Sequence, residues 1–339
     1  MVATLKQRLN RNNVVMVNLN DIKQAQQEIT RYIKQTPLIH SQFLSDLCSG
    51  SVYLKLENQQ VTQSFKIRGV MNKLLHLSPQ EKSQGVITAS AGNHGKAVAF
   101  GAQKLGFKAK VVVPTTTPAV KIDGIKQYGA ELLIYGETYT EAERKAKELS
   151  QTEGSLYISP YNDPRIIAGH GTIGLEILQE HPGTEVIVVP VGGGGLISGI
   201  SIAAKTTKPS IQVLGVQSTA TPIMFESLKA GKIVKPHRHE PKTVAEGLSG
   251  GIEENSITFP IVQEHVDKIY LVREQEIRHA IYLVWENAKQ IVEGSAATAV
   301  ALVVENKELF LGKTVALVMS GGNIDDSRFQ TVLTWERGN

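Results

Sequence analysis

The chain has 339 residues, of which 41% are hydrophobic and 20% are charged, and its formal net charge is +4. This composition is typical of a globular protein with about two domains. It contains no dense stripe of Lys and Arg interleaved with aromatic residues and no apolar run of membrane-spanning length, which argues against nucleic-acid-binding and membrane proteins.

The N-terminal region and the single cysteine indicate a cytoplasmic protein. The apolar patch Val14–Val17 is too short for the hydrophobic segment of a signal peptide, and residues 1–18 are expected to form a loosely held arm. Cys48 can form neither an internal disulfide nor a thiolate metal cluster, which favours a reducing compartment.

From residue 80 onward, short apolar runs alternate with segments of helical length. Strands are expected at 86–88, 110–113, 132–134, 186–189, 213–216 and 315–318. Helices are expected at 93–105 (ended by Gly106), from Pro118 to Gly129, and at 138–152, 164–180, 196–205, 274–290 and 294–305. This alternation predicts an α/β fold with parallel, doubly wound sheets. Residues 231–255 are expected to form a long loop beside the site.

Three of the predicted strands end in glycine-rich turns, at residues 90–95, 192–195 and 320–323. Ligands of open α/β sheets bind at the carboxyl ends of strands, so we expect the turns to converge. In the turn 192–195, four glycines precede a helix, and their backbone N–H groups can surround a phosphate. The turn lacks the Gly-Lys-Ser/Thr ending of a P-loop and the Gly-x-Gly-x-x-Gly spacing of a dinucleotide site. The ligand it favours is therefore a compact phosphate monoester. A flexible turn without a ligand is the alternative.

Lys66 is the candidate nucleophile of the sequence. It lies between Phe65 and Ile67, just before an amphipathic helical segment. Desolvation by such neighbours lowers the pKa of a lysine, and the neutral amine can form a Schiff base. A solvated surface lysine is the alternative interpretation.

The four motifs SFKIRG, SAGNHG, GGGGL and SGGN, at residues 64–69, 90–95, 192–196 and 320–323, occur in an order that resembles fold-type II pyridoxal-phosphate (PLP) enzymes. The chain is most similar to the serine/threonine dehydratase and serine racemase family, over about residues 20–330. The resemblance implies two doubly wound open-sheet domains, as in tryptophan synthase β-like folds, with the cofactor in the cleft between them. The large PLP-binding domain would comprise residues 19–62 and 159–339, and the small domain 63–158. It also implies a homodimer, with no C-terminal regulatory domain.

The same resemblance implies a role for each motif. Lys66 would hold PLP and move the Cα proton, and Phe65 would pack against the pyridine ring. Asn93 would bind the phenolic oxygen, and Ser320 would face the ring nitrogen as a neutral partner, which favours loss of a β leaving group. The phosphate would bind the backbone of Gly192, Gly193, Gly194, Gly195 and Leu196. The substrate carboxylate would bind the turn formed by Ser90, Ala91, Gly92, Asn93 and His94.

Two departures from the family pattern narrow the function. Racemases of this family resemble Ser-Ser-Gly-Asn-His at the carboxylate turn, where the second Ser is an acid/base; Ala91 cannot fill that role. The family's divalent-cation site would involve the neighbourhood of Gln217, Thr221 and Ile223, which lacks carboxylates, so we expect no divalent metal there. A monovalent ion is left open.

The other candidates each have a second interpretation. The resemblance places Glu293 near the cofactor, whereas the helix dipole alone would explain an acid at that position. Gly247 would lie in a second glycine loop that flanks the ring, or in an ordinary turn. His94 contacts the substrate or is a polar residue of a helix N-terminus. His237 and His239 lack metal-ligand spacing and are expected in a solvated loop.

The predicted function is PLP-dependent dehydration and deamination of a β-hydroxy amino acid, L-threonine or L-serine, to a 2-oxo acid and ammonia. A serine racemase, a hydroxyaspartate or phenylserine dehydratase, or a β-replacement synthase are alternatives within the class. A non-catalytic module that binds a phosphate ligand is the alternative outside it.

Overall fold

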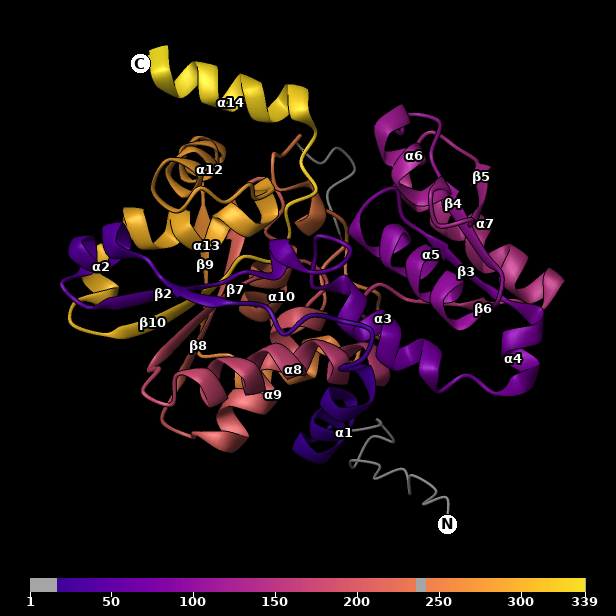
Figure 1. The fold of residues 1–339 in the computed structure, drawn as a ribbon, viewed down its shortest axis with the longest axis horizontal. Coiled ribbons are helices and arrows are strands. Elements are labelled where there is room, and N and C mark those ends of the chain that lie inside the picture. The colour runs from indigo at the N-terminus through magenta and orange to yellow at the C-terminus, as the bar shows by residue number, and fades with distance from the viewer. Residues whose placement is uncertain (1–16, 236–241, 339) are drawn as a thin grey trace.

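The computed structural model describes residues 17–235 and 242–338, and these contain two β-sheets (Figure 1). The strands are β1 (Leu38–His40), β2 (Ser51–Lys55), β3 (Val86–Ala89), β4 (Ala109–Val113), β5 (Glu131–Ile134), β6 (Leu156–Tyr157), β7 (Val186–Pro190), β8 (Gln212–Ser218), β9 (Lys268–Val272) and β10 (Thr314–Val318). The α-helices are α1 (Leu19–Ile29), α2 (Gln42–Cys48), α3 (Lys66–Leu75), α4 (Pro79–Gln84), α5 (Asn93–Leu105), α6 (Ala119–Lys126), α7 (Tyr139–Glu153), α8 (Pro164–Glu180), α9 (Gly195–Thr207), α10 (Ile223–Ala230), α11 (Thr258–His265), α12 (Glu274–Ala288), α13 (Gly294–Glu305) and α14 (Asp326–Gly338). Three short 3₁₀-helices are η1 (Glu57–Gln59), η2 (Glu246–Leu248) and η3 (Lys307–Phe310).

The larger sheet has the strand order β1-β2-β10-β7-β8-β9. Its strands are parallel except β1, which pairs with β2 in the antiparallel sense at the sheet edge. Strand β7 is buried at every position because helices cover both faces. Val186 and Val188 point into the core that contains α12 and α13, whereas Ile187 and Val189 point into the core that contains α8 and α9. Figure 1 shows these helix pairs on opposite sides of the sheet.

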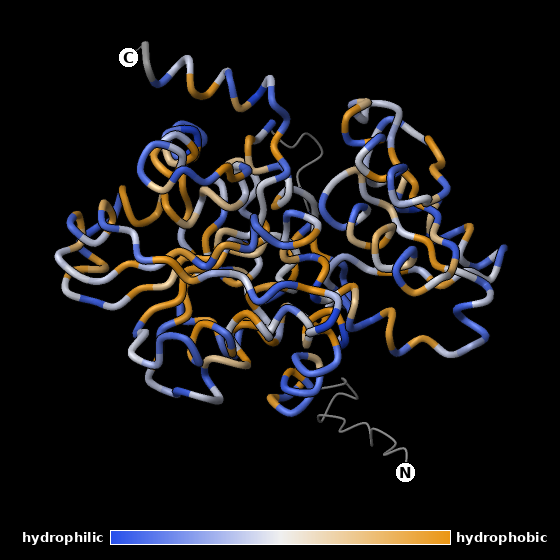
Figure 2. Tube along the Cα trace, in the orientation of Figure 1, coloured by the Kyte–Doolittle hydropathy of each residue, from blue (hydrophilic) through white to orange (hydrophobic). Residues whose placement is uncertain are grey.

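The smaller sheet has the order β5-β4-β3-β6, and all of its strands are parallel. Ile87 packs against α7 on one face, and Val111 and Val113 pack against α5 and α6 on the other. Figure 2 shows the resulting hydropathy pattern, with apolar strands inside and more hydrophilic helices around them. The prediction of an α/β fold with doubly wound sheets is confirmed, and the antiparallel edge strand β1 is the exception to the predicted parallel arrangement.

The helix boundaries follow the glycine and proline signals closely. Helix α5 has the predicted bounds, and Gly106 ends it with a φ of 77°. Pro118, predicted as the first helical residue, is instead the N-cap of α6, which ends at Lys126, before Gly129. Pro118 fits this position because its extended ψ of 145° lies outside the helical range.

The predicted N-terminal arm and long loop are only partly described. Residues 1–16 and 236–241, the latter with His237 and His239, lie outside the described residues. The prediction was wrong for the end of the arm: Val17 is buried, and the side chain of Asn18 caps α1. Within the predicted loop, η2 forms around Gly247.

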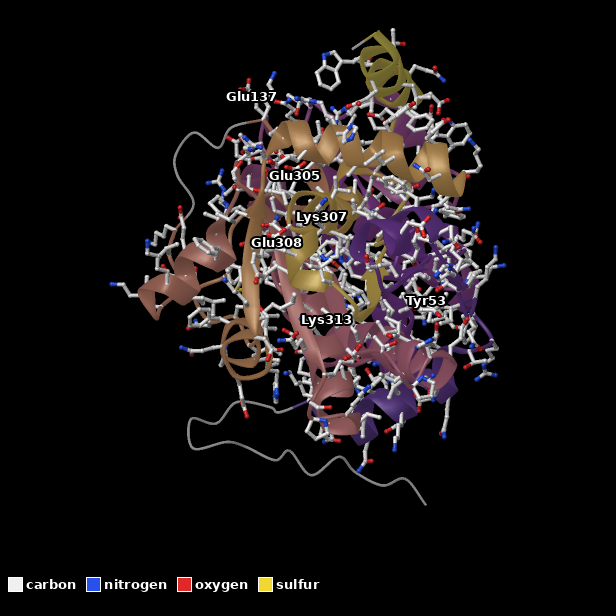
Figure 3. The ribbon with its side chains drawn as sticks, turned by 90° about the vertical axis from the view of Figure 1, so that its left-hand side faces the viewer. Tyr53, Glu137, Glu305, Lys307, Glu308 and Lys313 are labelled. Atoms are coloured by element: carbon white, nitrogen blue, oxygen red, sulfur yellow. The ribbon has the colours of Figure 1, made fainter. Side chains whose placement is uncertain are left out.

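Charges of both signs are mixed at the end of the larger sheet. Figure 3 shows this end of the molecule, where Lys307 and Lys313 lie on the same face as Glu305 and Glu308. Within the described ranges, 17–235 and 242–338, no helix is long and apolar enough to cross a membrane.

Candidate active site

The segment that leads into Lys66 is attached to the turn that follows β10. Ser64 forms an isolated antiparallel bridge with Gly321. The Phe65 N–H donates to the Ser320 carbonyl oxygen at 3.0 Å. Helix α3 then begins at Lys66, so two of the predicted motifs, far apart in the chain, meet at this residue.

Lys66 lies in surroundings that disfavour its charged form. Part of the side chain is accessible, but its amine is surrounded by protein, and this burial lowers its pKa to about 8. The opposing influence is the carboxylate charge of Glu293, which raises the pKa. The Nζ atom donates a hydrogen bond to the Pro160 carbonyl at 2.9 Å and lies 5.0 Å from the centre of the Phe65 ring. Since the pKa lies near neutrality, part of the population carries the nucleophilic amine.

A buried ion cluster anchors the first turn of α3. Arg68, fully buried, bonds Glu57 of η1 at 2.7 Å and Glu176 of α8 through its other guanidinium nitrogens. Lys55 also pairs with Glu176 at 2.7 Å, so two cations balance two anions. Of these four residues, only Arg68 lies in one of the sequence motifs. The sequence gives no signal that would pair Arg68 with carboxylates so far away in the chain.

The four-glycine turn forms an anion-binding cup. Among the described residues, the backbone N–H groups of Gly192 to Gly195 have no hydrogen-bond acceptor. Gly194 has a φ of +90°, and a Cβ on Gly193 would lie 2.5 Å from the Tyr161 ring. Glycine is therefore required at position 194 by the backbone conformation and at position 193 by the lack of space for a side chain. The turn opens helix α9, whose dipole adds positive potential at the cup.

The second glycine-rich turn lies at the N-terminus of α5. Its bend is tight, since a Cβ on Gly95 would lie 2.2 Å from the Ser90 carbonyl oxygen. The Gly92 N–H donates to Ser90 Oγ at 3.2 Å, whereas the Ala91 N–H has no acceptor among the described residues. This arrangement leaves polar backbone available to a carboxylate.

His94 is a buried neutral imidazole. Burial, aided by the charge of Lys66, lowers its pKa to about 3. Its Nε2 atom lies 3.0 Å from the Ile158 carbonyl oxygen and must carry the proton, which leaves Nδ1 as an acceptor with no partner.

Asn93 connects the turns across the site. Its Nδ2 donates to Glu293 Oε1 at 2.8 Å, and its Oδ1 accepts from Asn323 Nδ2 at 2.6 Å. The Glu293 N–H in turn donates to the Gly321 carbonyl oxygen at 3.0 Å. Burial raises the pKa of Glu293 to about 7. Asn93 and Glu293, two candidates from the sequence, are therefore in direct contact with each other.

Gly247 lies between Glu293 and the glycine cup. A Cβ on Gly247 would lie 3.6 Å from Glu293 Oε1, and one on Gly192 would lie 3.4 Å from the Gly247 carbonyl oxygen. Tyr161, next to the Pro160 that binds Lys66, lies against the opposite side of the cup. Lys66, the glycine cup, Gly247, Glu293 and Asn93 therefore surround one site. The turn that contains Ser320 closes it, because this turn binds both Phe65 and Glu293.

His170 and Tyr161 are two further residues here that sequence reasoning missed. The His170 ring is buried and packs edge-on against Phe65 at 4.7 Å between centroids. Burial holds the pKa of His170 well below its usual value. His170 lies inside an apolar helix and Tyr161 in a loop, and neither belongs to a glycine-rich turn, so periodicity gave no signal.

The residues present fit PLP. The unpartnered N–H groups of the cup suit its phosphate, and the Lys66 amine suits its aldehyde. The Ser320 side chain is buried, and its hydroxyl has no hydrogen-bond partner within residues 17–235 and 242–338, so it is available to the ring nitrogen. The phosphate cup and the amine are thus supplied by different helices, α9 and α3.

At the position of the family's divalent-cation site, the Gln217 side chain is bound by neighbouring backbone groups. Gln217 Oε1 accepts from the Phe225 N–H at 2.8 Å, and Gln217 Nε2 lies 3.4 Å from the Thr221 carbonyl oxygen. Ile223 supplies only an apolar side chain. In the part of the chain that the structure describes, no group of three or more His, Cys, Asp or Glu could hold a metal ion.

The family model for pyridoxal-phosphate dependent enzymes matches residues 29–321, and the chain belongs to this family. Its cofactor is therefore PLP, as predicted. The chain is 44% identical over 319 residues to the L-threonine ammonia-lyase of Thermotoga maritima, covering 94% of this chain and 78% of that protein. It is 41% identical over 322 residues to a catabolic L-threonine dehydratase of Staphylococcus aureus, covering 94% and 92%.

Solved structures share the same fold. The processed form of threonine deaminase isoform 2 from Solanum lycopersicum superposes with a TM-score of 0.89 at 36% identity, covering 95% of this chain and 88% of that one. Maize serine racemase gives a TM-score of 0.88 at 31% identity, covering 95% and 98%. The predicted fold-type II class is confirmed.

Proposed function

We propose that this protein is a PLP-dependent ammonia-lyase that converts L-threonine, and also L-serine, into a 2-oxo acid and ammonia. The observation that carries the proposal is the pairing of a buried amine of lowered pKa, Lys66, with the glycine cup of unpartnered N–H groups. The names of the two relatives, an L-threonine ammonia-lyase and an L-threonine dehydratase, support the substrate.

Bound PLP supplies an electron sink for the charge that develops at Cα. Lys66 would hold the cofactor through its amine, and its Nζ would take the α proton of the substrate. The Pro160 carbonyl, 2.9 Å from Nζ, accepts a hydrogen bond from the amine and orients its lone pair. The phosphate would be held by the cup residues Gly192, Gly193, Gly194, Gly195 and Leu196. Phe65 would pack against the ring, and Ser320 would face the ring nitrogen.

The turn at the start of α5 binds the substrate carboxylate through Ser90, Ala91, Gly92, Asn93 and His94. The Ala91 side chain is a methyl group, which can neither donate nor accept a proton. A second base on the face opposite Lys66 is thus missing at this position, which favours elimination over racemisation. His94 would take part through its backbone N–H, because its Nε2 donates to the Ile158 carbonyl and its Nδ1 can only accept.

We infer that the enzyme accepts both threonine and serine, because a single methyl group changes pocket affinity by only about 1–3 kcal/mol.

We further infer a cytoplasmic homodimer with a large domain of residues 19–62 and 159–339 and a small domain of 63–158. Cys48 is the single cysteine of the chain and cannot form an internal disulfide, which supports the compartment. The strands of the four-stranded sheet, all within residues 86–157, support the division.

The decisive experiment is borohydride reduction of the purified holoenzyme, followed by peptide mass analysis. We expect the pyridoxyl label on Lys66 in the wild type and in the control Lys73→Ala, which changes a lysine on the same helix. Lys66→Ala should lose the label and lower kcat for L-threonine by about a thousandfold or more. A label on another lysine, or undiminished turnover in Lys66→Ala, would refute the proposal.

A second measurement separates the lyase from its nearest rival, a serine racemase. Incubation with L-serine, followed by chiral analysis and a 2-oxo acid assay, should yield pyruvate and little D-serine. Predominant D-serine would assign the protein to the racemases.

A further inference from the structure

Glu293 does not act as the cap of its own helix. It occupies the N-cap position of α13, where a side chain normally accepts a hydrogen bond from an N–H of the first turn. No such bond forms here. Its Oε1 instead accepts from Asn93 Nδ2, on α5, at 2.8 Å. The helix dipole alone therefore does not explain this carboxylate, which is turned toward the site.

The neighbouring backbone makes room for the carboxyl group. A Cβ on Gly321 would lie 2.8 Å from Glu293 Oε1 and 3.2 Å from Asn93 Nδ2. Any side chain at Gly321 would thus displace the hydrogen bond between them. The second oxygen, Oε2, has no hydrogen-bond partner among the described residues. One oxygen is therefore fixed, and the other is available to the site.

Charged groups from three elements act on this carboxyl group. Burial raises its pKa to about 7, whereas the positive charges of Lys121 and Lys66 lower it and the negative charge of Glu246 raises it. The relation to Lys66 is mutual, because the Glu293 charge also raises the pKa of Lys66. The two buried histidines that adjoin Lys66 have lowered pKa values and are neutral near pH 7: His94 and His170.

We propose that Glu293 is a positioning residue for the reaction at Lys66, which aligns Asn93 through Oε1 and stabilises the protonated Lys66 nitrogen through its carboxylate charge. This inference rests on the proposed function. When Lys66 takes the α proton, the Cα–H bond breaks and Nζ gains a positive charge in a buried place. A carboxylate nearby offsets the cost of that charge. Aligning Asn93 leaves its second N–H available for the phenolic oxygen of the cofactor.

The two effects can be separated with two variants. Glu293→Gln keeps an oxygen that accepts from Asn93 but removes the charge, whereas Glu293→Ala removes both. The readout is the pH titration of the visible absorbance of the holoenzyme, which reports protonation at the Lys66–cofactor linkage without turnover. Removing a negative charge disfavours the protonated form, so both variants should shift the titration midpoint down by about one pH unit.

Turnover and a control complete the test. Glu293→Ala should lower kcat about tenfold more than Glu293→Gln, because only the alanine variant releases Asn93. The control is Glu305→Gln, which removes an exposed carboxylate at the opposite end of the same helix, α13; its midpoint should stay close to that of the wild type.

The outcomes distinguish this inference from the proposed function. If the wild type carries the label on Lys66 but Glu293→Gln titrates like the wild type, the role of Glu293 is overturned while the lyase stands. Equal kcat values for Gln and Ala would overturn the alignment of Asn93. If the wild type carries no label on Lys66, the proposed function itself fails.

Discussion

Asn323 donates a hydrogen bond to the side-chain oxygen of Asn93 at 2.6 Å, which joins the turn after β10 to the first residue of α5. A second bond, from the same Asn323 amide to the Thr62 carbonyl at 3.0 Å, ties this turn to the segment before Lys66. Because the Asn93 oxygen is occupied by a donor, its NH₂ group must face Glu293 and the site. The orientation of Asn93 is therefore fixed from two sides, by Asn323 at its oxygen and by Glu293 at its nitrogen.

Replacing Asn323 should disturb Asn93 without touching the cofactor. In Asn323→Ala, the Asn93 amide loses the donor that fixes its orientation, and we expect kcat for L-threonine to fall about tenfold, from the loss of roughly one hydrogen bond. Steady-state kinetics with saturating PLP would measure this. Asn287→Ala, an exposed asparagine on α12, serves as the control and should retain wild-type kcat. Equal activity of Asn323→Ala and this control would show that Asn93 is oriented in another way.

The lowered pKa of Lys66 predicts the pH dependence of cofactor uptake. Only the neutral amine attacks an aldehyde, and the pKa of about 8 means that the neutral fraction rises through that pH. The rate at which apoenzyme incorporates added PLP should increase about tenfold per pH unit below pH 8 and level off above it. Stopped-flow absorbance would follow the reaction. A rate that keeps rising to pH 10 would mean that Lys66 behaves as a solvated lysine.

The cup should be intolerant of a single methyl group. In Gly193→Ala the new Cβ would lie 2.5 Å from the Tyr161 ring, so either the ring or the turn must move. We expect the Kd for PLP to rise at least about tenfold, since the N–H groups of the cup would lose their alignment. Equilibrium dialysis of the apoenzyme would measure it.

A matched glycine variant controls for the stability of the fold. Gly124 lies within α6, and a Cβ there would meet nothing within 4 Å. Gly124→Ala should therefore leave the Kd unchanged and stabilise the protein by roughly 0.5–1 kcal/mol. Similar Kd values for both variants would show that Gly193 is not needed for cofactor binding.

The sequence predicted those parts of the site that depend on local backbone chemistry. Gly194 needs a positive φ, and Gly95 has no room for a side chain, so the turns were visible as glycines between apolar runs. The partners of Arg68 were not visible, because Glu57 and Glu176 reach it only through tertiary packing. The edge strand β1 was missed as well, since three residues are too few to show a period.

The buried ion cluster under α3 should contribute strongly to stability. Arg68→Met would leave the carboxylates of Glu57 and Glu176 buried without their guanidinium partner, and breaking a buried pair costs about 3–5 kcal/mol. Arg328→Met is the matched control: Arg328 pairs with Glu246 at the surface, where such pairs contribute about 0–1 kcal/mol. Denaturant unfolding of both holoenzyme variants at pH 7 would compare the losses.

The difference in the free energy of unfolding between wild type and Arg68→Met should depend on pH if it has an electrostatic origin. In the folded wild type, the pKa of Glu57 is lowered because the guanidinium charge and hydrogen bonds of Arg68 outweigh the opposing effect of burial. A carboxyl group whose folded pKa is lowered stabilises the protein above its unfolded pKa, and this contribution is lost as the pH falls through the folded pKa. In Arg68→Met the orphaned carboxyl groups can take up protons at mildly acidic pH, which relieves their burial. The free energies of unfolding of wild type and Arg68→Met should therefore converge between about pH 7 and pH 5. A difference that stays constant over this range would indicate that Arg68 stabilises the fold through packing alone.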